Sequence, residues 1–311
     1  MEEYPKNMIA FEKTFEGEEQ CLDYVLKVRW PEGARCRHCA GRTLWRAGAI
    51  LVCKQCGRQT RIMAGTLFEG THLPLQTWFR AIWWMVTQKN GLSALALKRE
   101  LGVSYKTAWA MLHKIRSVMV RPERARLAGC VEVDEVFIGG LEEGMRGRQP
   151  GAKQLVAIAA QERGRGIGRV RMRVLEDASA PRLLSFIKDN IEPASTVHTD
   201  AWKGYLPLKR HGYAHKVSVV KTQGPQALPR VHLAASLLKR WLLGTHQGAV
   251  SAAHLNAYLD EFVFRFNRRT SCSRGLLFFR VMQEAVRHVP VPFAKITKHT
   301  RPFIPGNAHS K

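Results

Sequence analysis

Four cysteines in two C-x-x-C pairs constrain the fold of this chain more than any other feature of its sequence. Cys36-Arg-His-Cys39 and Cys53-Lys-Gln-Cys56 are separated by 13 residues. Two such pairs can close four thiolates around one tetrahedral Zn²⁺. Between them, Leu44, Trp45, Ile50, Leu51 and Val52 supply a hairpin with little core of its own, so we expect this module to fold around its metal. The spacing predicts a structural zinc ribbon over residues 31–72, with His38 as a less favoured ligand.

The charge of the chain indicates a polyanionic partner. The sequence contains 49 Lys and Arg against 25 Asp and Glu, a net charge of +24. So many uncompensated cations repel one another unless a phosphate backbone meets them. A generally basic soluble protein is the alternative. No run of 18 apolar residues is present, so we expect no membrane partner. The odd number of cysteines favours a reducing, cytoplasmic compartment.

Residues 73–120 predict a helical DNA-binding unit, and an acidic helical segment is expected before the ribbon, over residues 1–30. Two helices meet at Gly102-Val103-Ser104, where Ser93 and Ser104 are placed to cap them. A helix pair with a glycine in its turn is typical of a helix-turn-helix, although a plain helical hairpin gives the same pattern. The side chains expected to be exposed and to contact DNA are Tyr105, Lys106, Trp109, His113 and Lys114.

The second half of the chain changes to alternating strands and helices. The expected strands are residues 130–138, 154–161, 168–175, 195–199 and 215–220, with helices between and after the last three. Three consecutive strands followed by alternation with helices are typical of a layered α/β domain. We place this domain at residues 128–285 and expect a flexible basic tail over residues 290–311.

The first of these strands, VEVDEVFIGG, contains a carboxylate that needs a partner. Strand alternation puts Asp134 on one face with Glu132, Val136 and Ile138. An isolated carboxylate in such a place costs several kcal/mol unless something pairs with it or coordinates it. Asp200 follows the strand STVHT, which can lie beside the first strand. We therefore predict that Asp134 and Asp200 meet and share divalent cations.

Taken in order along the chain, these features resemble the DDE-type transposases of bacterial insertion sequences, specifically the ISXO2-like family. The matching motifs are CRHC…CKQC, GTLFEGT, GVSYKTAWAMLHKIR, VEVDEVFIGG, TDAWKGY, LLKRWLLGTHQG and HLNAYLDEFVFRFNRR, over roughly residues 5–285. The resemblance implies a multidomain α/β protein with a zinc ribbon, a helix-turn-helix and an RNase H-like catalytic domain, in which a mixed sheet has flanking helices. It also implies that Asp134 and Asp200 are the first two catalytic acids.

The third catalytic position departs from the pattern that is usual in the family. A Glu, or in some subgroups Asn or His, precedes a Lys by seven residues on a helix, and here His232 precedes Lys239. Seven residues are about two helical turns, so both side chains share one face. We expect His232 to complete the site and Lys239 to contact substrate phosphate. Imidazole suits Mn²⁺ or Zn²⁺ better than Mg²⁺. Glu261 is the alternative third ligand.

The activity implied by the resemblance is metal-dependent phosphoryl transfer on DNA, with Mg²⁺ or Mn²⁺ at the acids. Cleavage would free a 3′-OH at the end of the element, and this group would then attack target DNA. The expected partners are the terminal inverted repeats, target DNA and a second copy of the chain, in the cytoplasm and on the nucleoid when bound to DNA. Two alternatives remain: a catalytically inactive or domesticated DNA-binding regulator, and a metal-dependent nuclease of RNase H type.

Overall fold

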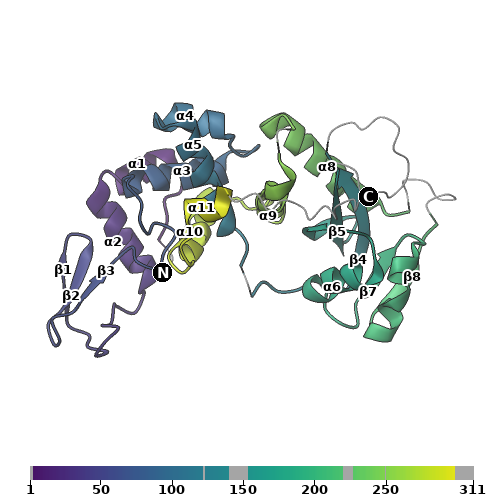
Figure 1. Cartoon of the computed structure of the whole chain (residues 1–311), viewed down its shortest axis with the longest axis horizontal. Helices are drawn as coiled ribbons and strands as arrows, with labels where there is room; N and C mark the ends of the chain where they lie inside the picture. Colours follow the sequence, from purple (N-terminus) through teal and green to yellow (C-terminus); the bar gives the residue numbers. More distant parts are fainter. Residues whose placement is uncertain (1–2, 122, 140–152, 220–226, 249, 298–311) are drawn as a thin grey trace, which may run out of the picture.

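The computed structural model of the chain describes residues 3–121, 123–139, 153–219, 227–248 and 250–297. These residues form two lobes that meet at a helical junction (Figure 1). One lobe holds the N-terminal helices and the cysteine-bearing strands, and the other holds a five-stranded sheet. None of the helices in the described residues is long and apolar enough to cross a membrane.

The core of the N-terminal lobe joins segments from both ends of the chain. Its main helices are α1 (Met8–Thr14), α2 (Glu18–Arg29), α3 (Leu75–Thr87) and α10 (Arg274–Ala285). The fully buried ring of Phe278 on α10 lies 5.6 Å from that of Phe11 and 5.6 Å from that of Phe79. The domain end predicted at residue 285 is therefore wrong, because α10 buries its apolar face in the N-terminal core rather than against the sheet.

The cysteine-bearing segment forms a small antiparallel sheet at the edge of this lobe. Its strands are β1 (Leu44–Ala47), β2 (Ile50–Cys53) and β3 (Gln59–Arg61). Leu51 and Ile62 are the residues of this sheet region that enter the core of the lobe. Arg29, at the end of α2, donates hydrogen bonds to the carbonyls of Ile62 and Ala64. The ribbon is thus attached to the lobe by apolar side chains, by the guanidinium group of Arg29 and by the ion pairs of Arg46 with Glu19 and Asp23 on α2.

The predicted helix pair is present as α4 (Ala94–Leu101) and α5 (Tyr105–Ser117). Gly102 ends α4 in the left-handed region, at φ 65°, which glycine adopts without steric cost. Ser93 and Ser104 accept hydrogen bonds from the first turns of the two helices, as the sequence predicted. A further short helix, α11 (Phe293–Thr297), lies against α5.

Part of the predicted flexible tail is therefore ordered. The ammonium group of Lys106 on α5 lies 4.9 Å from the ring centroid of Phe293. The prediction for residues 290–311 is wrong for the segment that forms α11, since this aromatic ring packs against a cation of α5. Residues 298–311 of the predicted tail lie outside the part of the chain that the structure describes.

The second lobe is built on a mixed sheet of five strands in the order β6-β5-β4-β7-β8. The strands are β4 (Cys130–Ile138), β5 (Gln154–Arg163), β6 (Gly166–Leu175), β7 (Thr196–Thr199) and β8 (Ala214–Val217). The first three pair antiparallel, and β7 and β8 then add in parallel beside β4. This order and these directions are those of an RNase H-like domain, so the predicted fold class is confirmed.

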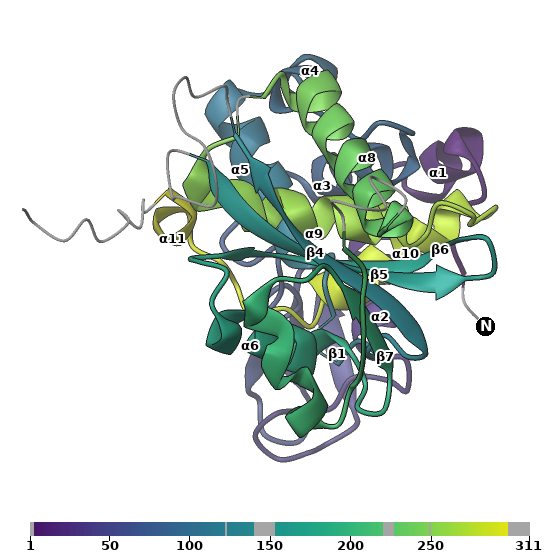
Figure 2. The same cartoon turned by 90° about the vertical axis from the view of Figure 1, so that its right-hand side faces the viewer.

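Helices cover both faces of the sheet (Figure 2). The helix α6 (Ala180–Asn190) and the 3₁₀ segment η1 (Lys203–His211) pack on the face that carries Val131 and Val133. The opposite face is covered by α8 (Pro229–His246) and α9 (Leu255–Phe266), which the short 3₁₀ segment η3 (Ala252–His254) separates. Because α9 also packs against α5, it forms the junction between the lobes.

Candidate functional site

Asp134 and Asp200 lie where β4 and β7 diverge. The parallel pairing of these strands runs as far as Glu132 and His198 and ends there. Asp134 and Asp200 each lie two residues beyond this last β4–β7 pair. The predicted neighbourhood of the two strands is therefore confirmed. Both aspartates are partly buried at the point where the sheet opens between them.

Tyr205, on η1, interacts with the charges of both acids. Its hydroxyl group donates a hydrogen bond of 2.8 Å to Glu135 Oε1. Burial raises the pKa of Tyr205 well above its usual value, and the charges of Glu135, Asp134 and Asp200 raise it further. One buried hydroxyl group thus lies within electrostatic reach of acids from two distant parts of the sequence. This common neighbour indicates that Asp134 and Asp200 share one region of the molecule.

His232 and Lys239 lie on α8, which begins beside β4. The backbone N–H of Val231 donates to the Glu132 carboxylate at 3.0 Å, so the first turn of α8 lies level with Glu132. His232 follows directly, and its Nε2 atom is buried without a hydrogen-bond partner. Lys239, two turns further on, is exposed and lines a cavity of about 670 Å³ together with the end of β4.

The donor set at this site fits a divalent cation by its chemistry. Carboxylate oxygens and an imidazole nitrogen are ligands for Mg²⁺, Mn²⁺ or Zn²⁺, and the buried Nε2 atom of His232 has no hydrogen-bond partner. The three side chains are not drawn tightly together, however. Among the described residues, only the cysteine set brings three or more ligand atoms within 4.8 Å of one another.

Glu261, the alternative third ligand, occupies a different place. It is fully buried on α9, and its Oε2 atom lies 2.9 Å from Arg116 Nε on α5. The guanidinium group of Arg116 also lies 4.0 Å from the ring centroid of Tyr258. The charge of Glu261 is therefore compensated by an arginine at the junction of the lobes, which argues against a role as a metal ligand.

The side chains predicted to contact DNA from α5 differ in exposure. Tyr105 and Lys106 are exposed in the first turn, whereas Trp109 and Lys114 are partly buried. His113 is only 6% exposed, so its predicted exposure is wrong. It packs against Trp109, His254 and Tyr258, because η3 and α9 cover this flank of α5. Burial, reinforced by the charge of Arg116, lowers its pKa to about 3.

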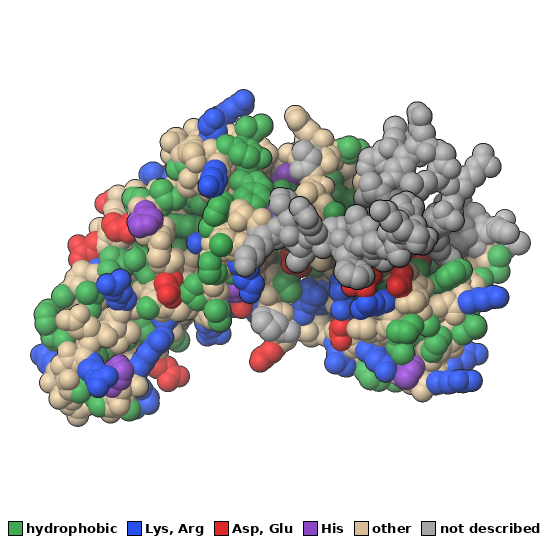
Figure 3. Space-filling view, viewed as in Figure 1, with side chains coloured by type: hydrophobic (Ala, Val, Ile, Leu, Met, Phe, Trp, Pro, Cys, Tyr) green, Lys and Arg blue, Asp and Glu red, His purple; other side chains and the backbone are tan. Residues whose placement is uncertain are grey.

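Basic side chains are spread over both lobes of the described residues. Figure 3 shows Lys and Arg on the zinc-ribbon end, around α4 and α5, and over the sheet domain. Of the α5 residues, Lys114 points its ammonium group toward Trp78, at 5.9 Å from the ring centroid. The first turn of α5, with Tyr105 and Lys106, is thus the part of this helix that is open to a partner.

The four cysteines are arranged as the sequence predicted. Their Sγ atoms all lie within 4.8 Å of one another, with Cys36 and Cys56 3.5 Å apart and Cys39 and Cys53 3.5 Å apart. Backbone N–H groups within the first pair, foremost that of Cys39, lower the pKa of Cys36 to about 6. Thiolates are the form that binds zinc. His38 lies outside this set, with its Nδ1 3.3 Å from Arg58.

Comparison with known protein families assigns both parts of the chain. Residues 126–267 match an ISXO2-like transposase domain, and residues 16–59 match a transposase zinc-ribbon domain. The chain carries an ISXO2-like transposase domain and a transposase zinc-ribbon domain. The four cysteines fall inside the zinc-ribbon match, and Asp134 and Asp200 fall inside the transposase-domain match, so the predicted family and its structural zinc site are supported together.

A curated relative extends over most of the transposase. It is an uncharacterized protein in the transposable element ISH50 of Halobacterium salinarum, 29% identical over 280 residues, which are 81% of this chain and 92% of the relative. Among solved structures, the Mos1 strand transfer complex and a pre-cleavage Mos1 transpososome are similar at TM-scores of 0.27. Their identities are 12% and 11%, over 67% of this chain and 74% and 77% of theirs.

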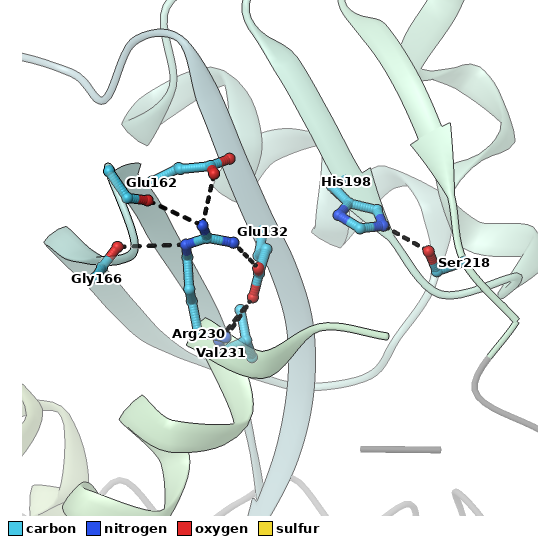
Figure 4. Close-up of polar contacts among 8 residues, drawn as sticks. Glu132, Glu162, Gly166, His198, Ser218, Arg230 and Val231 are labelled. Carbon is cyan, nitrogen blue, oxygen red and sulfur yellow. Dashed lines mark hydrogen bonds and ion pairs between the residues drawn. The ribbon is translucent and has the colours of Figure 1, made fainter. Parts of the chain in front are cut away.

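Sequence reasoning missed three residues of this site. Tyr205 interacts with both acids, while Glu132 and Arg230 bind each other beside the first turn of α8 (Figure 4). One signal for Glu132 is present in the sequence, since it precedes Asp134 by two residues and so shares its strand face. No comparable local signal marks Arg230 or Tyr205, because their roles depend on contacts between distant elements.

Proposed function

We propose that this transposase cleaves DNA at the ends of an insertion sequence and joins the freed 3′ ends to target DNA in a metal-dependent reaction. The observation that supports this most is the parallel pairing of β4 with β7, which brings Asp134 and Asp200 to one opening of the sheet. Each acid accepts a backbone hydrogen bond, Asp134 from Glu135 at 2.8 Å and Asp200 from Trp202 at 3.0 Å, but neither of these neutral donors compensates its negative charge. Shared coordination of a cation would compensate both charges.

Asp134 and Asp200 would hold the divalent ion, and His232 would supply a third donor through Nε2. Such an ion, when bound, lowers the pKa of a water molecule and stabilises the leaving 3′ oxygen. Lys239 would neutralise a phosphate of the DNA strand, because its ammonium group is exposed beside the cavity at the end of β4. Glu135 accepts a hydrogen bond from the hydroxyl group of Tyr205. We therefore assign the ion to Asp134 and Asp200 rather than to Glu135.

The N-terminal lobe would recognise the DNA end. Tyr205 and the acids belong to the other lobe, so recognition and chemistry are separated along the molecule. The first turn of α5 presents Tyr105 and Lys106, and N-terminal residues of a recognition helix are those that reach base edges. The zinc ribbon would add phosphate contacts. Holding two ends together requires a second copy of the transposase.

The test compares three substrates for the purified transposase, with Mn²⁺ and with Mg²⁺. These are duplexes ending in the inverted repeats that flank its coding region, unrelated duplexes, and RNA–DNA hybrids. We expect 3′-OH ends and joined products only with the repeat duplexes, and more with Mn²⁺ because of the imidazole ligand. Binding of the repeats without cleavage under either metal would support the regulator, and preferential cleavage of hybrids would support the nuclease.

A further inference from the structure

We propose that Glu132 and Arg230 are positioning residues that fix the first turn of α8, and with it His232, against the catalytic strand β4. The proposal rests on the proposed function, since it assigns a purpose to the placement of His232. Neither residue has a role in the reaction as described above. Together they form an ion pair between a buried glutamate and a partly exposed arginine, with Glu132 Oε1 2.8 Å from Arg230 Nη1 (Figure 4).

Glu132 acts as the cap of a helix to which it does not belong. The first N–H groups of any α-helix lack partners within the helix, and a side chain just before the helix usually accepts from them. In α8 that position is Leu228, whose side chain cannot accept a hydrogen bond. Glu132 Oε2 accepts instead, from the N–H groups of Arg230 at 2.7 Å and Val231 at 3.0 Å.

Arg230 extends the attachment across three strands. Its Nη1 atom binds Glu132 on β4, and its Nη2 atom lies 2.5 Å from Glu162 Oε1 on β5. Its Nε and Nη2 atoms also donate to the carbonyls of Gly166 at 3.3 Å and Gly164 at 3.2 Å. Hydrogen bonding to Glu132 raises the pKa of Arg230, so the guanidinium group stays charged. The first turn of α8 is therefore tied to the whole antiparallel part of the sheet.

The Glu132–Arg230 pair, which we call the clamp, lies close in the sequence to two of the proposed metal ligands. His232 follows Val231 directly, while Glu132 and Asp134 are two residues apart on one face of β4, roughly 7 Å along the strand. Glu132 is only 1% exposed, and both its oxygens are occupied by α8. It is thus not available as a metal ligand, even though it shares the face of Asp134. Its contacts hold the imidazole at a fixed distance from that acid.

A purely structural role makes a different prediction from a positioning role. If the clamp only stabilises the fold, its loss lowers the melting temperature and changes metal binding no more than any other destabilising substitution in this lobe. If it positions His232, its loss also weakens metal binding as the loss of the imidazole would. Partners that orient metal ligands typically contribute 10- to 100-fold in metal affinity, so we expect a weakening of about that size.

The experiment measures Mn²⁺ affinity by calorimetric titration of the full chain without DNA. The variants are Glu132→Gln, Arg230→Lys and His232→Ala. Gln keeps the shape of Glu132 but turns an N–H₂ group toward Arg230 or toward the helix, so one set of bonds is lost. Glu162→Gln is the matched control, because Glu162 touches the outer side of the same guanidinium group but no backbone of α8. Tyr213→Phe, on the other face of the sheet, controls for lost stability.

We expect Glu132→Gln to weaken Mn²⁺ binding about as much as His232→Ala, and to speed amide exchange at Arg230 and Val231. The Mn²⁺ affinity of Arg230→Lys should lie between those of Glu132→Gln and the wild type. Arg230→Lys provides the same test if Glu132→Gln does not fold. If His232→Ala leaves Mn²⁺ affinity unchanged, the role proposed for His232 is wrong. If His232→Ala weakens binding but both clamp variants bind like the controls, the positioning role alone is overturned.

Discussion

The cysteine set of this transposase and its proposed set of catalytic-metal ligands differ in how the chain brings them together. The four cysteines come from one short segment, and their sulfur atoms already lie within 4.8 Å of one another. Asp134, Asp200 and His232 come from β4, the end of β7 and the first turn of α8, and they are not gathered to that distance. A local set is formed by its own turns, whereas a dispersed set depends on the lobe that supports it.

The apolar cores that hold the cysteine set and the acid set in place also differ. The ribbon contributes only a few side chains, among them Leu51 and Ile62, to the core of its lobe. The sheet that carries the acids is covered on both faces, by apolar clusters around Val156 and Ile158 on one side and Val131 and Val133 on the other. We infer that the cysteine module depends on its metal for folding, while the acid site is held without one.

The largest effect is expected from removing the zinc. Chelation, or Cys39→Ser, should unfold β1–β3, because structural zinc supplies about 10–16 kcal/mol in small zinc modules. Protection of the sheet strands β4–β6 from amide exchange should persist, since their core does not include the ribbon. Exchange followed by mass spectrometry would measure both. If chelation also removed protection from β5, the sheet that carries the acids would depend on the zinc, which would contradict this comparison.

The next largest effect is expected on DNA cleavage, from substituting Asp134 or Asp200. Asp134→Asn or Asp200→Asn should lower DNA cleavage by about 10³-fold or more, the scale of losing a catalytic group. The melting temperature without metal should stay level or rise, because one of two neighbouring negative charges is removed. Asp189→Asn is the control, since Asp189 forms an ion pair with Arg173 at the surface. Full cleavage by either acid variant would exclude the proposed site.

Those parts of the fold that depend on local pattern were predictable. The cysteine spacing, the serine caps of the helix pair and the strand alternation around Asp134 each depend on residues close in the sequence, and the structure bears out all three. The neighbourhood of the first and fourth strands also followed, because few sheet orders suit three strands followed by alternation with helices.

Other features depend on contacts that no local pattern encodes. His113 has the helical spacing of an exposed residue, but α9 and η3 return from far along the chain to cover it. The apolar face of α10 is suited to either core, and Phe278 fits the aromatic cluster of the N-terminal lobe. Glu132 was visible beside Asp134, but its partner Arg230 could be recognised only once α8 was placed on β4.

Glu261 is a buried acid whose charge is compensated by an arginine rather than by a metal. Loss of this ion pair should have an effect on stability that ranks between the effects above and the one below. Glu261→Gln or Arg116→Met should cost about 3–5 kcal/mol of unfolding free energy, because each leaves the other buried charge or donor unpaired. Replacing both by apolar residues should restore much of that loss. Denaturant titration measures the stability, and calorimetry should show unchanged Mn²⁺ affinity. Loss of Mn²⁺ binding in a folded Glu261→Gln variant would instead make Glu261 the third ligand.

The smallest expected effect is on the pH dependence of stability, and it distinguishes His232 from two other histidines. The Nε2 atoms of these two, His113 and His246, are also buried without hydrogen-bond partners. Burial and then Arg116 lower the pKa of both junction histidines to about 3. Below about pH 6.5 the unfolded chain takes up protons that the folded chain does not, so stability should fall as the solution becomes acidic. The melting temperature should drop by about 2–4 °C per kcal/mol lost.

Substituting both junction histidines by Gln should flatten this fall between pH 7 and pH 5, because Gln keeps a polar side chain that does not titrate in this range. Calorimetric scans at each pH, with and without Mn²⁺, measure the effect. Mn²⁺ should raise the melting temperature equally in the wild type and in this double variant, but not in His232→Ala. An unpartnered imidazole nitrogen would then mark a metal ligand only where carboxylates share its surroundings, as we propose for His232 with Asp134 and Asp200. Equal loss of Mn²⁺ stabilisation in the double variant would remove that distinction.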